Sequence, residues 1–403
     1  MPGPLHGVRV IDLTGMVSGP ATTMMLADQG ADVIKVENPS GGGDHTRHVA
    51  SRRGGLATSF LNNNRNKRSV TIHLKHAEGL AVLKRLLKGA DVLVQNFRPG
   101  VAERIGVGED AVREIAPDII HVSICGFGFE GPYAAKPVYD PLIQALSGLA
   151  TVQAGSDQER PRLVRTILPD KLTGIVAAQA ISAALFARER SGEGQAIHLS
   201  MLDSVIAFLW GSDMESQTLA DGSIPQQKAQ SFIDLIYETT DGYISVAVQQ
   251  DKEWWGLTRA LDKPEWLEDE RFKTSSGRHH NINDRLMMTQ EVLRTASSDH
   301  WIGRLEAEGV PCAPVLTRTE MISHPQIQAN GIVTEHDHPT TGWIRQARPA
   351  ARFSKTDFEL RHTGAELGQH TDEVLAEAGF GADEIAALRQ TGVFGTMTKE
   401  AAE

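Results

Sequence analysis

Cysteine and positive charge are both scarce in this chain. Its 403 residues include two cysteines, Cys125 and Cys312, each in an apolar segment, so neither a disulfide framework nor a thiolate metal site is expected. His336 and His338 could share one face of a strand as metal ligands, but no third ligand is indicated, and we expect no metal. Lys and Arg total 40 against 51 Asp and Glu, which gives a net charge of -11. Because neutralising phosphates needs a surplus of basic residues, we expect no nucleic-acid partner.

Several targeting and catalytic signals are also missing. The first residues contain no basic and apolar signal segment, and no run reaches the length expected of a membrane span, so we predict a cytoplasmic protein with no membrane partner. There is no G-x-S-x-G, no H-E-x-x-H and no Walker lysine loop. The turn with Gly15 and Gly19 does not match G-x-G-x-x-G. Hydrolase, phosphate-loop and nicotinamide or flavin functions therefore lack their main signatures.

Strand and helix patterns alternate through the first half of the chain. A strand at 8–13, a helix at 20–29 and a strand at 31–37 form a βαβ unit, which predicts an α/β fold with a parallel sheet. Further strands are expected at 70–74, 91–95, 119–124 and 196–200. Further helices are expected at 77–88, 141–149 and 201–220.

The composition changes after Asp221-Gly222. A polar linker at 226–231 precedes a predicted hairpin at 232–248 and helices near 254–261, 281–295 and 300–308, which indicate a smaller α+β domain. Short strands and helices near 371–378 and 382–391 follow. We therefore predict three segments: 1–222 as a large domain, 223–325 as a small α+β domain, and 326–403 returning to the large domain.

Asp170 opens the longest apolar helical pattern in the chain, which runs from Leu172 to Gly192. The position predicts a helix N-cap, where an Asp accepts hydrogen bonds from free backbone amides and stays ionised near neutral pH. Most Asp residues before helices are caps and nothing more. The functional interpretation depends on the rest of the chain.

A local basic cluster interrupts the acidic chain at 61–77. It contains Arg65, Lys67, Arg68 and Lys75 and no acidic residue, so it could bind an anionic ligand such as a phosphate or form a solvated face. The loop at 96–100 follows a predicted strand, where parallel sheets place their ligands.

Together these segments resemble the family III CoA-transferases, to which formyl-CoA transferase and carnitine CoA-transferase belong. The order and spacing of the matching segments carry the resemblance along the whole chain. They are 10–14, 19–20, 26–37, 66–69, 94–100, 139–140, Asp170, 194–195 and 370–375.

The resemblance implies a fold, an assembly and a mechanism. The fold is a Rossmann-like large domain built from both chain ends plus a smaller α+β domain, in an interlocked homodimer. By position Asp170 matches the family's nucleophilic aspartate, which attacks an acyl-CoA thioester to give a mixed anhydride and then an aspartyl-CoA thioester. The expected partners are thus an acyl-CoA, with coenzyme A as its carrier, a carboxylic acid acceptor and a second copy of the chain.

The family's CoA contacts carry over to a set of loop residues, several of them basic. They are Val17, Ser18, Asn38, Ile72, His73, Leu74, Lys75, Asn96, Phe97, Arg98, Arg104, Pro137, Val138, Tyr139 and Asp140. Tyr139 is expected to line the acyl site.

Two differences from formyl-CoA transferases bear on the substrate. Val17 stands where those enzymes have glutamine, and the segment 230–237 contains no glycine where they have a glycine-rich lid. Short dicarboxylic or branched acids fit better than formate or oxalate. An α-methylacyl-CoA racemase of the same fold is an alternative, although Tyr139 replaces its catalytic His; a catalytically silent CoA-binding protein is another.

Overall fold

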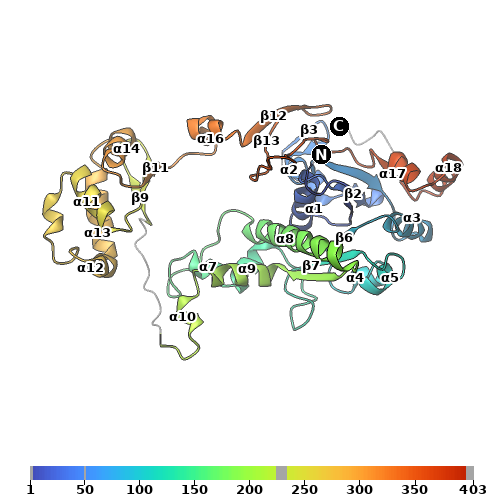
Figure 1. Ribbon diagram of the computed structural model, residues 1–403, viewed down its shortest axis with the longest axis horizontal. Helices are drawn as coiled ribbons and strands as arrows, with labels where there is room; N and C mark the ends of the chain where they lie inside the picture. The colour runs from blue at the N-terminus through green and yellow to red at the C-terminus, as the bar shows by residue number, and fades with distance from the viewer. Residues whose placement is uncertain (1–2, 50, 224–233, 396–403) are drawn as a thin grey trace. The chain divides into compact units, whose positions relative to one another are not determined.

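The computed structural model describes residues 3–49, 51–223 and 234–395 and forms two compact units (Figure 1). The first unit comprises Met1–Gln153, Arg162–Ile224 and Ile332–Glu403, and the second comprises Ala154–Pro161 and Pro225–Gly331. The linker predicted at 226–231 lies outside the described residues.

A six-stranded sheet forms the centre of the first unit, and all its strand pairs are parallel. Its strands are β1 (Arg9–Asp12), β2 (Asp32–Glu37), β5 (Lys67–Thr71), β6 (Val92–Gln95), β7 (Ile120–Cys125) and β8 (Ala196–Ser200). Their order is β5-β2-β1-β6-β7-β8, which is the Rossmann strand order. The predicted α/β class is therefore confirmed. The order reverses between β1 and β6, where the carboxyl ends of open parallel sheets form a ligand crevice.

Apolar side chains that alternate along the strands are buried against helices on both faces of this sheet. Val10 and Val33 pack with residues of α1 (Ser18–Asp28) and α8 (Leu168–Ser191) on one face. Ile11 and Ile34 pack with Leu83 and with the C-terminal segment on the other face. The helices that contribute to the second face are α3 (Ala77–Leu87), α4 (Val101–Arg104), α5 (Glu109–Arg113), α17 (Thr371–Glu377) and α18 (Ala382–Gln390).

Several elements differ from their predicted bounds, among them a strand and a helix of the first unit. The strand expected at 70–74 lies at Lys67–Thr71, because three polar residues at its start are buried and paired with other side chains. The helix expected at 201–220 ends at Trp210 as α9 (Met201–Trp210), and a separate short helix α10 (Glu215–Thr218) follows. Gly211 is the C-cap of α9, which is consistent with the weak helix propensity of glycine.

The helix α8 has the length and composition of a membrane span, contrary to the expectation that no segment has them. Such a helix is weak evidence for a membrane, because core helices of soluble proteins pass the same test. Within α8, residues such as Ala177, Ile181 and Leu185 are buried in the core that covers the sheet.

The other elements of the first unit lie around this sheet. They are β3 (Arg52–Arg53), β4 (Leu56–Ala57), α2 (Thr58–Asn64), α6 (Asp140–Leu146), α7 (Leu149–Val152), and the hairpin of β12 (Val333–His338) and β13 (Gly342–Ala347).

The second unit has its own antiparallel sheet, in the order β11-β10-β9, and its own core around Trp254, Phe272 and Leu305. Its strands are β9 (Ile236–Glu238), β10 (Tyr243–Val246) and β11 (Cys312–Pro314). Its helices are α11 (Asp251–Ala260), α12 (Ser275–His280), α13 (Ile282–Leu293), α14 (Ser298–Ala307), α15 (Glu320–Ser323) and α16 (Pro325–Asn330).

Candidate active site

Asp170 lies in the first turn of α8 rather than at its N-cap, so that prediction was wrong. The helix begins at Leu168, Pro169 occupies its first turn, and the N-cap residue Ile167 has no side chain able to bind the free amides. The Asp140 carboxylate takes over part of that role, because its Oδ2 accepts a hydrogen bond from the backbone N–H of Asp170 at 3.4 Å.

The carboxylate of Asp170 binds a neighbouring helix. Its Oδ1 accepts a hydrogen bond from the backbone N–H of Ser18, the first residue of α1, at 3.2 Å. Gly174 permits this approach, since a Cβ there would lie 3.1 Å from the carbonyl oxygen of Ser18 and 3.2 Å from the Cβ of Ala21. The bare backbone at Gly174 therefore lets the two helices come close enough for one to hold the carboxylate of the other.

Burial has the largest influence on the pKa of both carboxylates of this site, Asp170 and Asp140. It raises the pKa of Asp170, the nearby charge of Asp140 raises it further, and the hydrogen bonds from Ser18 oppose both. Burial also raises the pKa of Asp140, whose Oδ1 accepts a 2.6 Å hydrogen bond from Gln144. The direction for Asp170 is opposite to the effect of a helix N-terminus alone. A raised pKa makes the ionised carboxylate more basic than an ordinary aspartate.

The turn between β1 and α1 is fixed from the adjacent strand β6. The side chain of Asn96 accepts a hydrogen bond from the N–H of Gly15 at 2.9 Å and donates one to its carbonyl oxygen at 2.8 Å. This contact bridges the two strands at which the sheet order reverses. Asn96 thus shapes the turn that leads to Ser18.

The loops expected to contact CoA follow adjacent strands at the carboxyl edge of the sheet. Ile72–Lys75 follows β5, Asn38 follows β2, Val17 follows β1, and Asn96–Arg98 follows β6, while 137–140 lies in the connection after β7. These residues therefore share one edge of one unit.

Their exposure differs. The side chains of Asn38, Lys75, Arg98, Arg104, Pro137 and Tyr139 are exposed, and those of Val17, His73, Leu74, Asn96, Phe97 and Val138 are partly buried. Ile72, Ser18 and Asp140 are buried. Within the described part of the chain, no ion pair involves Arg98 or Arg104, so both guanidinium groups are available to an anion.

The basic cluster is mostly structural, which corrects both interpretations offered for it. Arg65 pairs with Asp28 at 2.6 Å, Lys67 with Asp12 at 3.1 Å, and Arg68 with Asp32 at 2.7 Å, and all three basic residues are buried. Their charges are therefore neither solvated nor free for a phosphate. Lys75 alone of the four is exposed.

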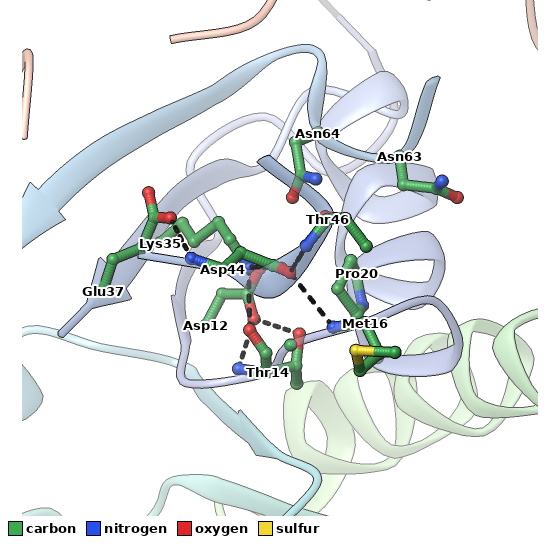
Figure 2. Close-up of polar contacts among 12 residues, drawn as sticks. Asp12, Thr14, Met16, Pro20, Lys35, Glu37, Asp44, Thr46, Asn63 and Asn64 are labelled. Carbon is green, nitrogen blue, oxygen red and sulfur yellow. Dashed lines mark hydrogen bonds and ion pairs between the residues drawn. The ribbon is translucent and has the colours of Figure 1, made fainter. Parts of the chain in front are cut away.

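A group of buried charges behind the turn was not identified from the sequence. Figure 2 shows the carboxylate of Asp44 between the ammonium of Lys35 and the backbone N–H of Met16. No sequence pattern marks Asp44. The contact of Gln144 with Asp140 is different, because a spacing of four residues on a helix places two side chains on the same face.

The candidate metal and thiol residues have other surroundings. Among the described residues there is no group of three or more His, Cys, Asp or Glu side chains placed to hold a metal. His338 is buried, with one ring nitrogen 2.9 Å from the carbonyl oxygen of Gly364. Both cysteines are free, and burial raises the pKa of Cys125 to about 11, so it stays a neutral thiol at neutral pH.

Comparison with known proteins gives the family. A family model described as CoA-transferase family III matches residues 5–371. A human succinyl-CoA:glutarate CoA-transferase is 34% identical over 93% of this chain and 86% of its own length. A formyl-CoA:oxalate CoA-transferase of Shigella sonnei is 33% identical over 97% of this chain and 99% of its own. A crystal structure of a CaiB/BaiF family protein from Brucella suis superposes with a TM-score of 0.81 at 31% identity, covering 94% of this chain and 100% of that one.

The chain therefore belongs to CoA-transferase family III, and the resemblance noted in the sequence is confirmed. Enzymes of this family use CoA thioesters as substrates. The parallel sheet described above is the fold of the matched structure.

Proposed function

We propose that this enzyme transfers CoA from an acyl-CoA to a carboxylic acid and that Asp170 is its nucleophile. The observation that carries the proposal is the half-buried Asp170 carboxylate, held by the Ser18 amide at the ligand edge of the sheet. A carboxylate in that place combines a raised pKa with a fixed orientation.

The transfer proceeds in four steps. The free oxygen of Asp170 attacks the thioester carbonyl carbon, the carbon–sulfur bond breaks, and CoA leaves as a thiolate from a mixed anhydride. The thiolate attacks the aspartyl carbonyl carbon, which releases the donor acid as a carboxylate and leaves an aspartyl-CoA thioester. The acceptor carboxylate attacks that thioester and expels the thiolate again, forming a second anhydride. Attack of the thiolate on the acceptor's carbonyl carbon gives the new acyl-CoA and frees Asp170.

The protein's groups contribute orientation and charge. The N–H of Ser18 holds Oδ1 of Asp170, which leaves Oδ2 as the oxygen that attacks the substrate. Asp140 accepts from the Asp170 amide, so it fixes the backbone beneath the nucleophile. Its negative charge also keeps the nucleophile basic.

The anionic CoA requires cationic contacts. We assign them to Lys75 and Arg98, which are exposed in loops at that sheet edge, and to Arg104, which is exposed at the end of α4, while Val17, Ser18 and the 137–140 segment line the acyl end. The remaining CoA contacts predicted from the sequence are part of this proposal.

A short dicarboxylic acid is the proposed acceptor class. Val17 presents an apolar, partly buried side chain at the start of α1, which suits a carbon chain longer than that of formate or oxalate. The relatives named for succinate and glutarate, in human and in Agrobacterium fabrum, use acids of that kind.

A homodimer with interlocked chains is part of the proposal, as are the domain division and the cytoplasmic location. The support for an assembly is the number of large apolar side chains exposed on α6, α8 and α9, three helices that contact one another. They are Leu142, Leu146, Ile175, Phe186, Phe208 and Trp210. Large exposed apolar areas are typical of protein interfaces. Light scattering of the purified protein should give twice the mass of one chain.

The first experiment traps the covalent intermediate. The protein is incubated with a panel of acyl-CoAs and hydroxylamine, and peptide mass spectrometry should find a hydroxamate on Asp170. Asp170→Asn, which conserves the shape of the side chain, should lose transfer activity while remaining folded by circular dichroism. Near-normal transfer by that variant would contradict the mechanism, and deuterium uptake at the α-carbon of a branched acyl-CoA would indicate the racemase instead.

A further inference from the structure

Met16 holds a backbone conformation that side-chain-bearing residues rarely adopt. Its φ is +68°, in the left-handed region, and it lies in the turn between β1 and α1, two residues before Ser18. The backbone N–H of Met16 donates a hydrogen bond to Oδ1 of Asp44 at 3.2 Å. A conformation of this kind persists only where the surroundings enforce it.

Several other contacts hold the Asp44 carboxylate in place, so it can act as the acceptor for the Met16 amide. It is buried, and its Oδ1 also accepts hydrogen bonds from the N–H and the hydroxyl of Thr46, each at 2.9 Å. Its Oδ2 pairs with the ammonium of Lys35 at 2.9 Å. Figure 2 shows these contacts converging on the one carboxylate. Burial alone would raise the pKa of Asp44, but the charge of Lys35 and the hydrogen bonds from Thr46 hold that pKa below its ordinary value, so Asp44 is ionised at neutral pH.

The residues before Met16 are held as well. The N–H of Thr14 donates to Oδ1 of Asp12 at 2.8 Å, and the carbonyl oxygen of Thr14 accepts from Lys35 at 2.7 Å. Asn96 binds both polar backbone groups of Gly15. Asp44 supplies the last of these contacts before the chain enters α1.

We propose that Asp44 is a positioning residue of the transfer reaction: by holding Met16 in the left-handed conformation, it sets the Ser18 amide against the Asp170 carboxylate. The inference rests on the proposed function, in which Asp170 is the nucleophile. Asp44 itself touches no reacting atom and acts through the turn.

The proposal has a specific consequence for the titration of Asp170. Without its acceptor, Met16 relaxes to negative φ, the direction of the chain into α1 changes, and the Ser18 N–H moves away from Asp170. That hydrogen bond opposes the effects of burial and of Asp140, so its loss raises the pKa of Asp170. The other charged groups of this site, Asp140 on α6 and Lys171 next along α8, stay in place.

Two variants test the proposal. Asp44→Ala removes the acceptor. Met16→Pro removes the donor and fixes φ near −65° while leaving the pair of Asp44 and Lys35 intact, so it keeps the test valid if the first variant fails to fold. In either variant kcat at neutral pH should fall about tenfold, and the acidic limb of the pH profile of kcat should move to higher pH.

Two further variants separate positioning from general damage. Thr46→Val removes another hydrogen bond to the same Asp44 oxygen but leaves the turn, so its acidic limb should stay where the wild type has it. In the double variant with Met16→Gly and Asp44→Ala, the acidic limb of the kcat profile should shift part of the way back to its wild-type pH. Glycine adopts positive φ without needing a hydrogen bond to hold it there.

The outcomes distinguish the two proposals. One outcome is that the wild type forms the Asp170 hydroxamate, while the folded variants Asp44→Ala and Met16→Pro have the same kcat and the same acidic limb as the wild type. That outcome overturns the positioning role and leaves the mechanism standing. If the wild type forms no hydroxamate with a donor that it turns over, the mechanism fails and the positioning role fails with it. A shifted limb in both variants, partly restored by Met16→Gly, supports the positioning role.

Discussion

Gly174→Ala should separate activity from stability in this enzyme. The added Cβ would lie 3.1 Å from the Ser18 carbonyl oxygen and 3.2 Å from the Ala21 Cβ, which is closer than ordinary van der Waals contact. The two helices must therefore move apart by a few tenths of an ångström. The Ser18 hydrogen bond to Asp170 is already 3.2 Å long, so the same movement takes it to about 3.5 Å, beyond a normal hydrogen bond.

The two effects of this substitution on stability oppose each other. Alanine is favoured over glycine in a helix interior by about 1 kcal/mol, whereas overpacking costs about 1–3 kcal/mol. The free energy of unfolding should thus fall by no more than about 2 kcal/mol. Loss of the fixed carboxylate orientation should lower kcat by about 10- to 100-fold.

The assay pairs steady-state transfer kinetics with urea unfolding, and Gly303→Ala is the matched control. Gly303 lies inside α14 with no atom near its absent Cβ, so that variant should gain about 1 kcal/mol and keep its kcat. Wild-type kcat in folded Gly174→Ala would refute the account of how α1 and α8 build the site.

Two other predictions concern pH. Asp140→Asn removes a negative charge that raises the pKa of Asp170 while conserving the acceptor for its amide, so the acidic limb of kcat/KM should move to lower pH; a limb that stays fixed would exclude that coupling. Asp12, buried with Lys67, has its pKa lowered to about 2, so the stabilisation of about 2 kcal/mol that it supplies is present above pH 4 and lost as the pH falls towards 2. Urea unfolding should show that additional acid loss in the wild type and not in Asp12→Asn, and equal losses would contradict it.

The alternation of strand and helix patterns predicted the parallel sheet, because the spacing of apolar residues along the sequence follows directly from which side chains are buried. The same signal placed β5 three residues too late, since Lys67, Arg68 and Ser69 are buried although they are polar. Their burial depends on partners such as Asp12 and Asp32, which are far away in the sequence. The residues that surround a position in the sequence do not reveal such distant pairs.

The candidate site could be predicted only in part, because its contacts also join residues that are far apart in the sequence. The sequence pattern singled out Asp170 and the loop of Asn96, and the resemblance suggested their roles, but their contacts with Ser18 and Gly15 join different elements of the fold. The N-cap prediction for Asp170 was wrong because α8 begins two residues earlier, and the Asp140 carboxylate, distant in the sequence, supplies part of its cap. Asp44 carried no signal at all, as its role depends on the conformation of Met16.

One core cluster has a consequence for how the chain is made. Ile11, near the beginning, is buried against the same cluster as Val393 and Phe394, near the end. A ribosome adds roughly 5–20 residues per second, so tens of seconds separate the synthesis of these partners. During that time one face of the nascent sheet lacks its final cover and is a natural client for chaperones. Completion of this core therefore waits until Val393 and Phe394 have been made, and truncation after α16 should yield aggregated protein during expression.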